Sequence, residues 1–349
     1  MTAMVISGQT SSTAVVQSVR GLPRARLQPS FAGAAAVLVV LAIAAPSAGQ
    51  ALVNNGTIAM GVRPHGNLGI ANGLPSNQGN QVTSVHHMPS HFDGMDNDME
   101  GEGWGLNYDG AAGPVGWADS AVTGSGPTGS FSTPPPTLVS FTPNTALTCV
   151  TSVVKVGDIQ MTQAYCPHAT VPEVYRDDIT FQNVGPVVHN NILYRRQMAW
   201  GMGARLAGGT SISDAWTGSI DVLPAGSTPP PAIIKVGQVD FATNLNPLLA
   251  WTPRNTCGVF FPTTCVPTPP TGEGPPGQPG FQKMAPPSDD GIVWDFNFGT
   301  LNPGEQVSAT LFYGAAPTRA QAIADLNAVG AQEYNLMQST IPTSPGSPN

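Results

Sequence analysis

Glycine and proline are so frequent in this chain that they limit the folds open to it. Forty of the 349 residues are glycine and 35 are proline, about a fifth of the chain. Both residues destabilise helices, because glycine loses much backbone entropy on folding and proline lacks an N–H donor. A hydrophobic share of 41% still allows a core, and a charged share of only 10% argues against a charge-rich disordered chain. The sequence therefore excludes a mainly helical protein and favours a turn-rich β protein.

The N-terminal segment predicts a secretory signal peptide over residues 1–50. Three arginines precede an uncharged apolar run at 31–45, and small residues follow near Ala48. This order is typical of a cleaved signal peptide, and a run of about 15 residues is shorter than the roughly 20 that span a bilayer. We therefore expect a secreted, extracellular protein with no membrane span after cleavage.

The charge of the expected mature chain constrains its partners. Cleavage before Ala51 removes three of the 13 Lys and Arg and none of the 21 Asp and Glu, which leaves 10 basic side chains and a net charge of −11. Such a surface offers no basic patch to nucleic acid and is repelled by anionic lipid. We expect an extracellular glycan or an envelope protein as the partner, and no nucleic acid.

Four cysteines predict two local disulfides, Cys149 with Cys166 and Cys257 with Cys265, as in an oxidising compartment. Two β-prone runs flank the Gly-Asp dipeptide at 157–158, and a two-residue turn there pairs residues whose numbers sum to 315, as 149 and 166 do. Directly opposed residues on antiparallel strands have Cα atoms about 4.5–5.5 Å apart, within the disulfide range. The second pair would close a short loop. No CxxC spacing supports a zinc site made of these cysteines.

An all-β fold, an antiparallel β-sandwich with long Gly/Pro-rich loops and one short C-terminal helix, is the architecture that these patterns predict. In the segment 174–183, apolar Ile179 and Phe181 alternate with polar residues, as on a sheet with one solvated face. Thr318 and Gln321 resemble a capping box, and Gly330 stands where a helix C-cap belongs.

We expect one sandwich domain over residues 51–337, followed by a flexible tail at 338–349. Two Gly/Pro-rich stretches, 72–137 and 253–290, are expected to be loop insertions, because proline cannot donate to a central strand ladder. Further turn signals are expected to join neighbouring strands at residues 64–67, 185–186 and 302–304.

Four segments carry a resemblance to known proteins: NGTIAMGVRPHGNLGI at 55–70, EGWG at 102–105, NILYRRQMAW at 191–200 and FNFGTLNPGEQVSATLFYGAAPTRAQAIADLNAVGAQEYNL at 296–336. They resemble segments of a group of poorly characterised secreted bacterial β-sandwich proteins, some of which carry a C-terminal PEP-type sorting signal. The resemblance implies an exported β-sandwich with no established activity. The chain has Ala199 where members often have an acidic residue, and no sorting signal follows Tyr334.

The densest polar cluster, at 86–102, predicts a calcium loop, because alternating acids near a glycine supply the hard oxygen ligands that calcium prefers. An EF-hand is excluded, since the twelfth position from Asp96 is Asn107 and not a bidentate glutamate. The candidate ligands are Asp93, Asp96, Asp98, Glu100 and Glu102. The alternatives are a solvated acidic loop, and a zinc or copper site of His86, His87, His91 and Asp93.

The chain carries no nucleophile elbow, HExxH helix, Walker loop or dinucleotide fingerprint, so no catalytic residue is assigned. We expect a secreted, non-catalytic structural or binding protein of the envelope or extracellular matrix, with calcium as its stabilising ion. The alternative is an extracellular carbohydrate-binding or glycoside-hydrolysing protein, whose carboxylates would lie about 5–10 Å apart. Its candidate residues are Glu100, Glu102, Asp109 and Asp295, with Trp104, Tyr108 and Trp117 as aromatic surfaces for sugar or as plugs for the loops.

Two further polar positions receive structural interpretations. Adjacent strand residues point to opposite faces, so one of Arg195 and Arg196 is expected to face inward and to need a carboxylate partner. We expect a structural ion pair there, with a ligand clamp as the alternative. His189 is expected to be a packed or solvent-facing strand residue and not a general base.

Overall fold

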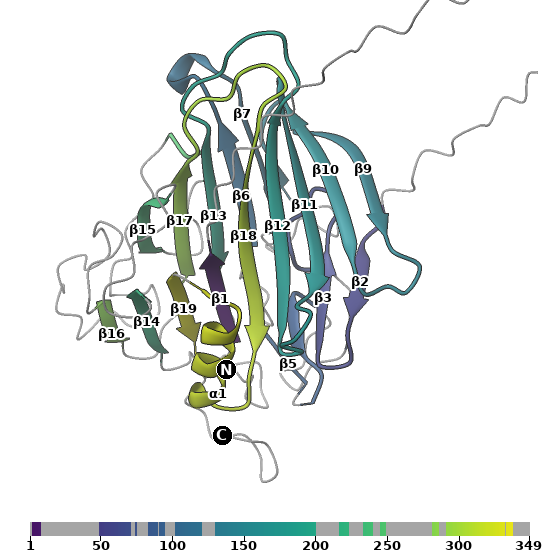
Figure 1. Ribbon diagram of the computed structural model, residues 1–349, viewed down its shortest axis with the longest axis vertical. Helices are drawn as coiled ribbons and strands as arrows, with labels where there is room; N and C mark the ends of the chain where they lie inside the picture. The colour runs from purple at the N-terminus through teal and green to yellow at the C-terminus, as the bar shows by residue number, and fades with distance from the viewer. Residues whose placement is uncertain are drawn as a thin grey trace, which may run out of the picture.

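The computed structural model describes residues 2–7, 49–70, 74, 83–89, 91–94, 102–120, 130–199, 216–222, 233–239, 245–248, 281–285, 291–331 and 333–337. Most of these residues lie in β-strands of three antiparallel sheets (Figure 1). The only helices among them are α1 (Arg319–Ala328) and the short 3-10 helix η1 (Gly110–Ala112), and neither is long enough to span a membrane. The predicted all-β sandwich is therefore confirmed.

The largest sheet has nine strands in the order β16-β14-β19-β1-β18-β12-β11-β10-β9. In that order the strands are β16 (Phe281–Ala285), β14 (Trp216–Val222), β19 (Glu333–Met337), β1 (Thr2–Ser7), β18 (Gln306–Ala315), β12 (Val174–Asn183), β11 (Ile159–Pro167), β10 (Val150–Val156) and β9 (Thr137–Pro143).

Two smaller sheets complete the fold. The six-stranded sheet has the order β15 (Ile233–Val239), β17 (Gly291–Asn297), β13 (Leu193–Ala199), β6 (Glu102–Asn107), β7 (Val115–Asp119) and β8 (Ser130–Phe131). The four-stranded sheet has the order β2 (Ala51–Asn54), β3 (Ile58–Val62), β4 (Val85–His87) and β5 (Phe92–Asp93).

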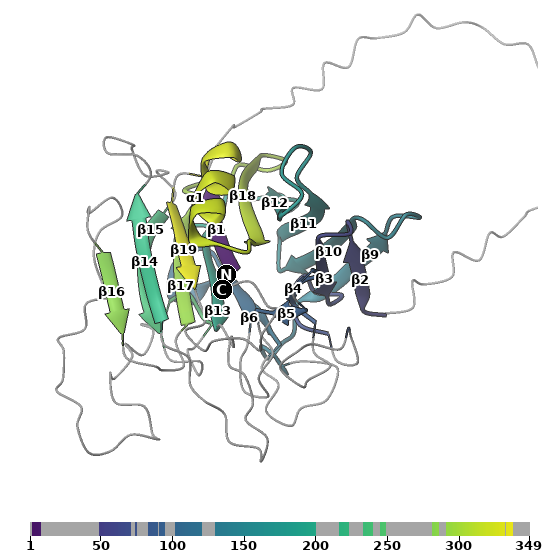
Figure 2. The same ribbon diagram turned by 90° about the horizontal axis from the view of Figure 1, so that it is seen from below.

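The nine-stranded and six-stranded sheets pack face to face, and the core lies between them (Figure 2). Aromatic rings meet across this interface, as Phe181 of β12 and Tyr194 of β13 do at 5.1 Å between centroids. The four-stranded sheet lies beside β9 and β10 in both views, and the Asn54 amide donates to the Leu147 carbonyl there. The turn after β3 extends from this sheet into the core of the sandwich.

The predicted disulfide hairpin is confirmed. Val156 pairs with Ile159 across the turn at 157–158, and the register places Cys149 opposite Cys166. The two cysteines form a disulfide with Cα atoms 4.4 Å apart. The second predicted disulfide, Cys257 with Cys265, lies outside the described residues.

The strands on either side of two expected turns lie in different sheets. β12 belongs to the nine-stranded sheet and β13 to the six-stranded sheet, and β17 and β18 are divided in the same way. The connecting segments, 184–192 and 298–305, cross between the sheets and pair with each other through His189 and Leu301. These two connections are too long for tight hairpin turns, so they allow the chain to change layers.

The structure differs from the expected loop insertion over 72–137, because five short strands, β4 to β8, lie within it. β6 is an interior strand between β13 and β7. Its glycines serve close packing, since a Cβ atom at Gly105 would lie 1.7 Å from the Leu245 carbonyl oxygen. Of the other expected insertion, 253–290, only β16 is among the described residues.

Both chain ends contribute to the nine-stranded sheet. β1 pairs with β18 on one side and β19 on the other, although it lies within the predicted signal peptide, so cleavage near Ala48 would remove it. α1 begins as predicted, with the Thr318 hydroxyl accepting from the Gln321 amide, and is followed by Gly330 at φ +69°. The tail at 338–349 lies outside the described residues.

Candidate functional site

The structure places two of the five predicted calcium ligands, and they lie in different sheets. Asp93 in β5 accepts hydrogen bonds from the Ser84 amide and from the Ser84 hydroxyl, the latter at 2.5 Å. Glu102 begins β6, and its Oε2 accepts from the Leu68 amide at 2.5 Å. Among the described residues, no three His, Cys, Asp or Glu side chains are grouped so that they could hold a metal ion. The other three ligands, Asp96, Asp98 and Glu100, lie outside those residues, and calcium stays a prediction.

The histidines expected for zinc or copper lie around β4. His86 is fully buried, its Nδ1 is 3.7 Å from an Asp93 oxygen, and neither ring nitrogen makes a hydrogen bond. The His91 ring meets the His86 ring edge-on at 5.8 Å between centroids. Burial lowers the pKa of His87 to about 4, so this side chain is neutral at pH 7.

Arg196 on β13 is the centre of a buried polar network between the two large sheets. Its Nε contacts Glu102 Oε1 on the neighbouring strand β6, and both side chains are fully buried. Its Nη1 donates to Gln163 Oε1 at 2.7 Å, and its Nη2 donates to the Tyr165 hydroxyl at 2.9 Å. Gln163 and Tyr165 belong to β11 of the opposite sheet, so one guanidinium group ties the sheets together.

Two buried acids lie in this network beside one cation. Burial raises the pKa of Glu102 to about 7, although the Arg196 charge opposes this shift. Burial likewise raises the pKa of Asp177 on β12 to about 7, although the Arg196 charge and the Tyr165 hydroxyl oppose this shift. Burial lowers the pKa of Arg196, but the Glu102 carboxylate and nearby tyrosines raise it by more than burial lowers it. The pKa of Arg196 therefore lies well above its ordinary value, and the guanidinium stays charged. The three groups are neutral together only when one acid is protonated.

The turn after β3 supplies backbone acceptors to the same network. The His65 carbonyl accepts from the Trp104 indole at 2.7 Å, and the Gly66 carbonyl accepts from the Tyr165 hydroxyl at 2.6 Å. Gly66 has φ +80°, and a Cβ atom there would lie 1.8 Å from Gln163 Nε2. The segment VRPHGN therefore forms a turn whose carbonyls satisfy buried donors of both large sheets.

Arg195 points to the opposite face of β13. Its Nε and Nη2 donate to the two oxygens of Asp295 at 2.7 and 2.8 Å, and its Nη1 donates to the Asn246 carbonyl at 3.1 Å. The side chains of Arg195 and Asp295 are 1% and 8% exposed. A buried arginine with a carboxylate partner was expected at one of the two positions, and both arginines have one.

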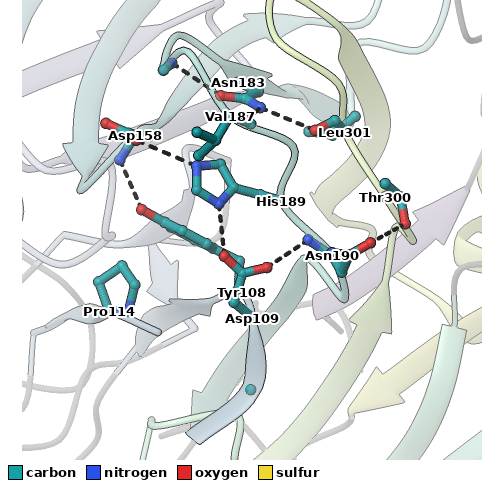
Figure 3. Close-up of polar contacts among 12 residues, drawn as sticks. Tyr108, Asp109, Pro114, Asp158, Asn183, Val187, His189, Asn190, Thr300 and Leu301 are labelled. Carbon is teal, nitrogen blue, oxygen red and sulfur yellow. Dashed lines mark hydrogen bonds and ion pairs between the residues drawn. The ribbon is translucent and has the colours of Figure 1, made fainter. Parts of the chain in front are cut away.

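A histidine, His189, lies between the carboxylates of Asp109 and Asp158 (Figure 3). His189 is in the crossover between β12 and β13, and its Nδ1 is 2.7 Å from Asp109 Oδ2. Its Nε2 is 3.3 Å from Asp158 Oδ2. The Tyr108 ring packs on the imidazole at 4.4 Å between centroids, and the Tyr108 hydroxyl accepts from the Asp158 amide at 2.8 Å. We call these four residues the His189 cluster.

Local backbone geometry holds the His189 cluster in place. Asp109 has φ +58°, a left-handed conformation that aspartate tolerates better than most residues, and its Oδ1 accepts from the Asn190 amide at 2.7 Å. Burial raises the pKa of Asp109, but hydrogen bonds from Asn190 and His189 outweigh it and lower the pKa below the ordinary value. The Asn190 side chain in turn accepts from the Thr300 hydroxyl of the second crossover (Figure 3).

The residues considered for sugar recognition have internal partners where the structure describes them. Trp104 and Tyr108 are buried in the core, and Trp117 is half-buried. Glu102 and Asp295 are paired with arginines, and Asp109 is paired with His189. The aromatic residues therefore act as plugs between sheet and loops, which is the second of the two roles considered.

Asp177 and the side chains of β11 in the network were not singled out from the sequence. The alternation along β12 could have identified Asp177, because every second residue of this strand faces the core, and Asp177 lies at one of those positions with Tyr175, Ile179 and Phe181. An acid at an inward position requires a buried partner or a proton. The cross-sheet role of Gln163 and Tyr165 had no comparable signal, since it depends on which sheets face each other.

Comparison with models of known protein families finds none that matches this chain, and comparison with curated proteins finds no match either.

Proposed function

We propose that this chain is a secreted, non-catalytic structural or binding protein of the envelope or extracellular matrix, akin to the secreted bacterial proteins that its motifs resemble. The main support is that the charged residues of its EGWG and YRR motifs are internal. Glu102 and Arg196 have side chains that are 0% exposed, and Arg195 is 1% exposed. Side chains in these positions stabilise the sandwich and cannot reach a substrate, so an extracellular glycan or an envelope protein would bind elsewhere on the surface.

The carbohydrate-active alternative has less support. Its stacking surface would need exposed aromatic rings, whereas Trp104 and Tyr108 are buried. Its carboxylate pair would need two acids free to meet substrate, whereas Glu102 and Asp295 each hold an arginine.

Export and catalysis can be tested together on the full chain. We expect a bacterial secretory host to release the chain with a new N-terminus near residue 51, and we expect no turnover on a panel of glycosides. Peptide sequencing and a reducing-sugar assay are the measurements. Retention of residues 1–50 in the released protein would contradict secretion by cleavage. Glycoside turnover that Asp109→Asn abolishes would contradict a non-catalytic role.

We also propose calcium as a stabilising ion, held by Asp96, Asp98 and Glu100. Asp93 and Glu102 border this segment, but each already has internal partners. The three acids alternate in sequence, which is a spacing that suits a loop wrapped around one hard cation.

Calcium should raise the melting temperature of the full chain relative to EDTA. At a concentration 100 times Kd, a bound ion adds about 2.7 kcal/mol, or about 5–10 °C for a domain of this size. The triple variant D96N/D98N/E100Q should lose this shift, and magnesium in place of calcium should give less. An unchanged melting curve in millimolar calcium would remove calcium from the proposal.

A further inference from the structure

The contacts of His189 determine its charge state. A carboxylate oxygen only accepts hydrogen bonds, and a neutral imidazole has a single N–H, so it can satisfy only one carboxylate. In the His189 cluster each ring nitrogen faces a carboxylate oxygen, at 2.7 Å on the Asp109 side and 3.3 Å on the Asp158 side. Both hydrogen bonds form together only when both ring nitrogens carry a proton.

The cluster joins three connections that are distant in sequence. Asp109 follows β6 of the six-stranded sheet, and Asp158 lies in the β10–β11 turn of the nine-stranded sheet. His189 is in the crossover between the two sheets and is 7% exposed at its side chain. The imidazolium therefore links the ends of both layers at one point (Figure 3).

The groups that face this imidazole are few in the part of the chain that is described. From the loop after β6 they are Tyr108 and Asp109, and from the β10–β11 turn the only one is Asp158. The second crossover faces the cluster with Thr300 and Leu301, and its acid Glu305 instead accepts from Asn302. Two carboxylates and one imidazole thus determine how the contact responds to pH.

We propose that the His189 cluster is a pH-sensitive latch between the ends of the two sheets, closed when the imidazole is protonated. Loss of one ring proton removes one of the two hydrogen bonds. The longer contact, to Asp158, is the one released, because Asp109 also holds the Asn190 amide at 2.7 Å. The crossover stays joined to the turn through the Val184 amide, which donates to the Asp158 carbonyl, so opening the latch loosens this connection without breaking it. The loosened segment carries the exposed side chains of Val184, Val187 and Val188, which form an apolar surface.

Amide hydrogen exchange of the full chain at pH 5.5 and pH 8.5 tests the latch, with rates corrected for intrinsic exchange. We expect protection in the β10–β11 turn and the 184–190 crossover to fall at least tenfold between the two pH values, relative to strand β3. Asp158→Asn should make protection in these segments independent of pH, because an amide can bond to the neutral ring. Asp178→Asn is the matched control on β12 and should keep the wild-type response.

Equal protection of both segments at the two pH values in the wild-type chain would overturn the latch. A wild-type pH response that persists in Asp158→Asn would also overturn it, since the released contact would then be a different one. Both D158N and D178N replace acids that are 40% or more exposed, so folding of the variants is not in doubt.

Discussion

A buried guanidinium group is stable only when its charge and its donors are met, and Arg196 has both needs met by groups from two sheets. Glu102 balances the charge, and Gln163 and Tyr165 accept from the two terminal nitrogens. Removing one partner of a buried ion pair is more damaging than replacing both, because the remaining charge is left without compensation in an apolar surrounding.

Glu102→Gln should lower the free energy of unfolding by about 3–5 kcal/mol, because it removes the carboxylate that contacts the buried Arg196 guanidinium. Urea unfolding followed by tryptophan fluorescence measures this change. The double variant E102M/R196M should recover much of the loss. Asp178→Asn breaks an exposed pair with Arg176 and should cost less than about 1 kcal/mol. A small effect of E102Q would mean that Glu102 is already protonated in the folded chain.

The raised pKa of Asp177 predicts that the stability of the folded chain falls as the pH rises. Burial raises its pKa to about 7 in the folded chain, whereas an aspartate in an unfolded chain has a pKa of about 3.9. The folded chain therefore binds this proton more tightly, so the stabilisation is complete below about pH 4 and is lost as the pH rises to about 7. The loss is on the order of 4 kcal/mol.

Asp177→Asn should remove this part of the dependence, because the amide stays neutral at every pH. The variant should gain stability relative to wild type between pH 4.5 and pH 8, as measured by urea unfolding at both values. Asp178→Asn, one residue along on the exposed face of β12, should show no such gain. A constant difference between D177N and wild type across this range would refute the assignment.

Among the elements, the turn after β3 has a larger structural role than its length suggests. It connects β3 of the four-stranded sheet to the core of the sandwich, where its carbonyls accept from Trp104 and Tyr165. Gly66 permits this approach, both through its left-handed backbone and through the space that a missing side chain leaves for Gln163.

Gly66→Ala and Gly304→Ala separate these two contributions. Both glycines have φ +80°, but a Cβ atom at Gly304 would meet nothing within 4 Å. Gly304→Ala should therefore cost only the backbone strain, about 1–2 kcal/mol. Gly66→Ala should cost about 1–3 kcal/mol more, because the methyl group displaces Gln163. Equal melting temperatures for the two variants would show that the turn does not pack as described.

Local patterns in the sequence predicted several elements correctly. The Cys149–Cys166 register follows from turn geometry, and the α1 cap follows from Thr318 and Gln321, because in each case the interacting groups lie within about one turn or hairpin of each other. Alternation in β12 likewise identified which residues face the core.

The sequence did not show which strands and side chains that are distant along the chain lie next to each other in the fold. Period-two alternation shows which face of a strand is buried but not which sheet the strand joins, so the division of β17 and β18 between layers could not be read. Glu102 was grouped with the acids that precede it, although its partner Arg196 is contributed by a strand far along the chain. The glycines of β6 were interpreted as part of a loop, because the residue that packs against them could not be identified from the sequence. That residue is Leu245, which is more than 130 positions further along the chain.

The position of β18 also affects the order in which the fold can be completed. This strand pairs with β12 across about 130 residues, as the hydrogen bond between Thr180 and Ser308 with a separation of 128 illustrates. Contacts so distant in sequence form late, because a long loop must close first. A chain still being synthesised, with residues 306–315 not yet available, therefore has an open β12 edge and an unfinished core.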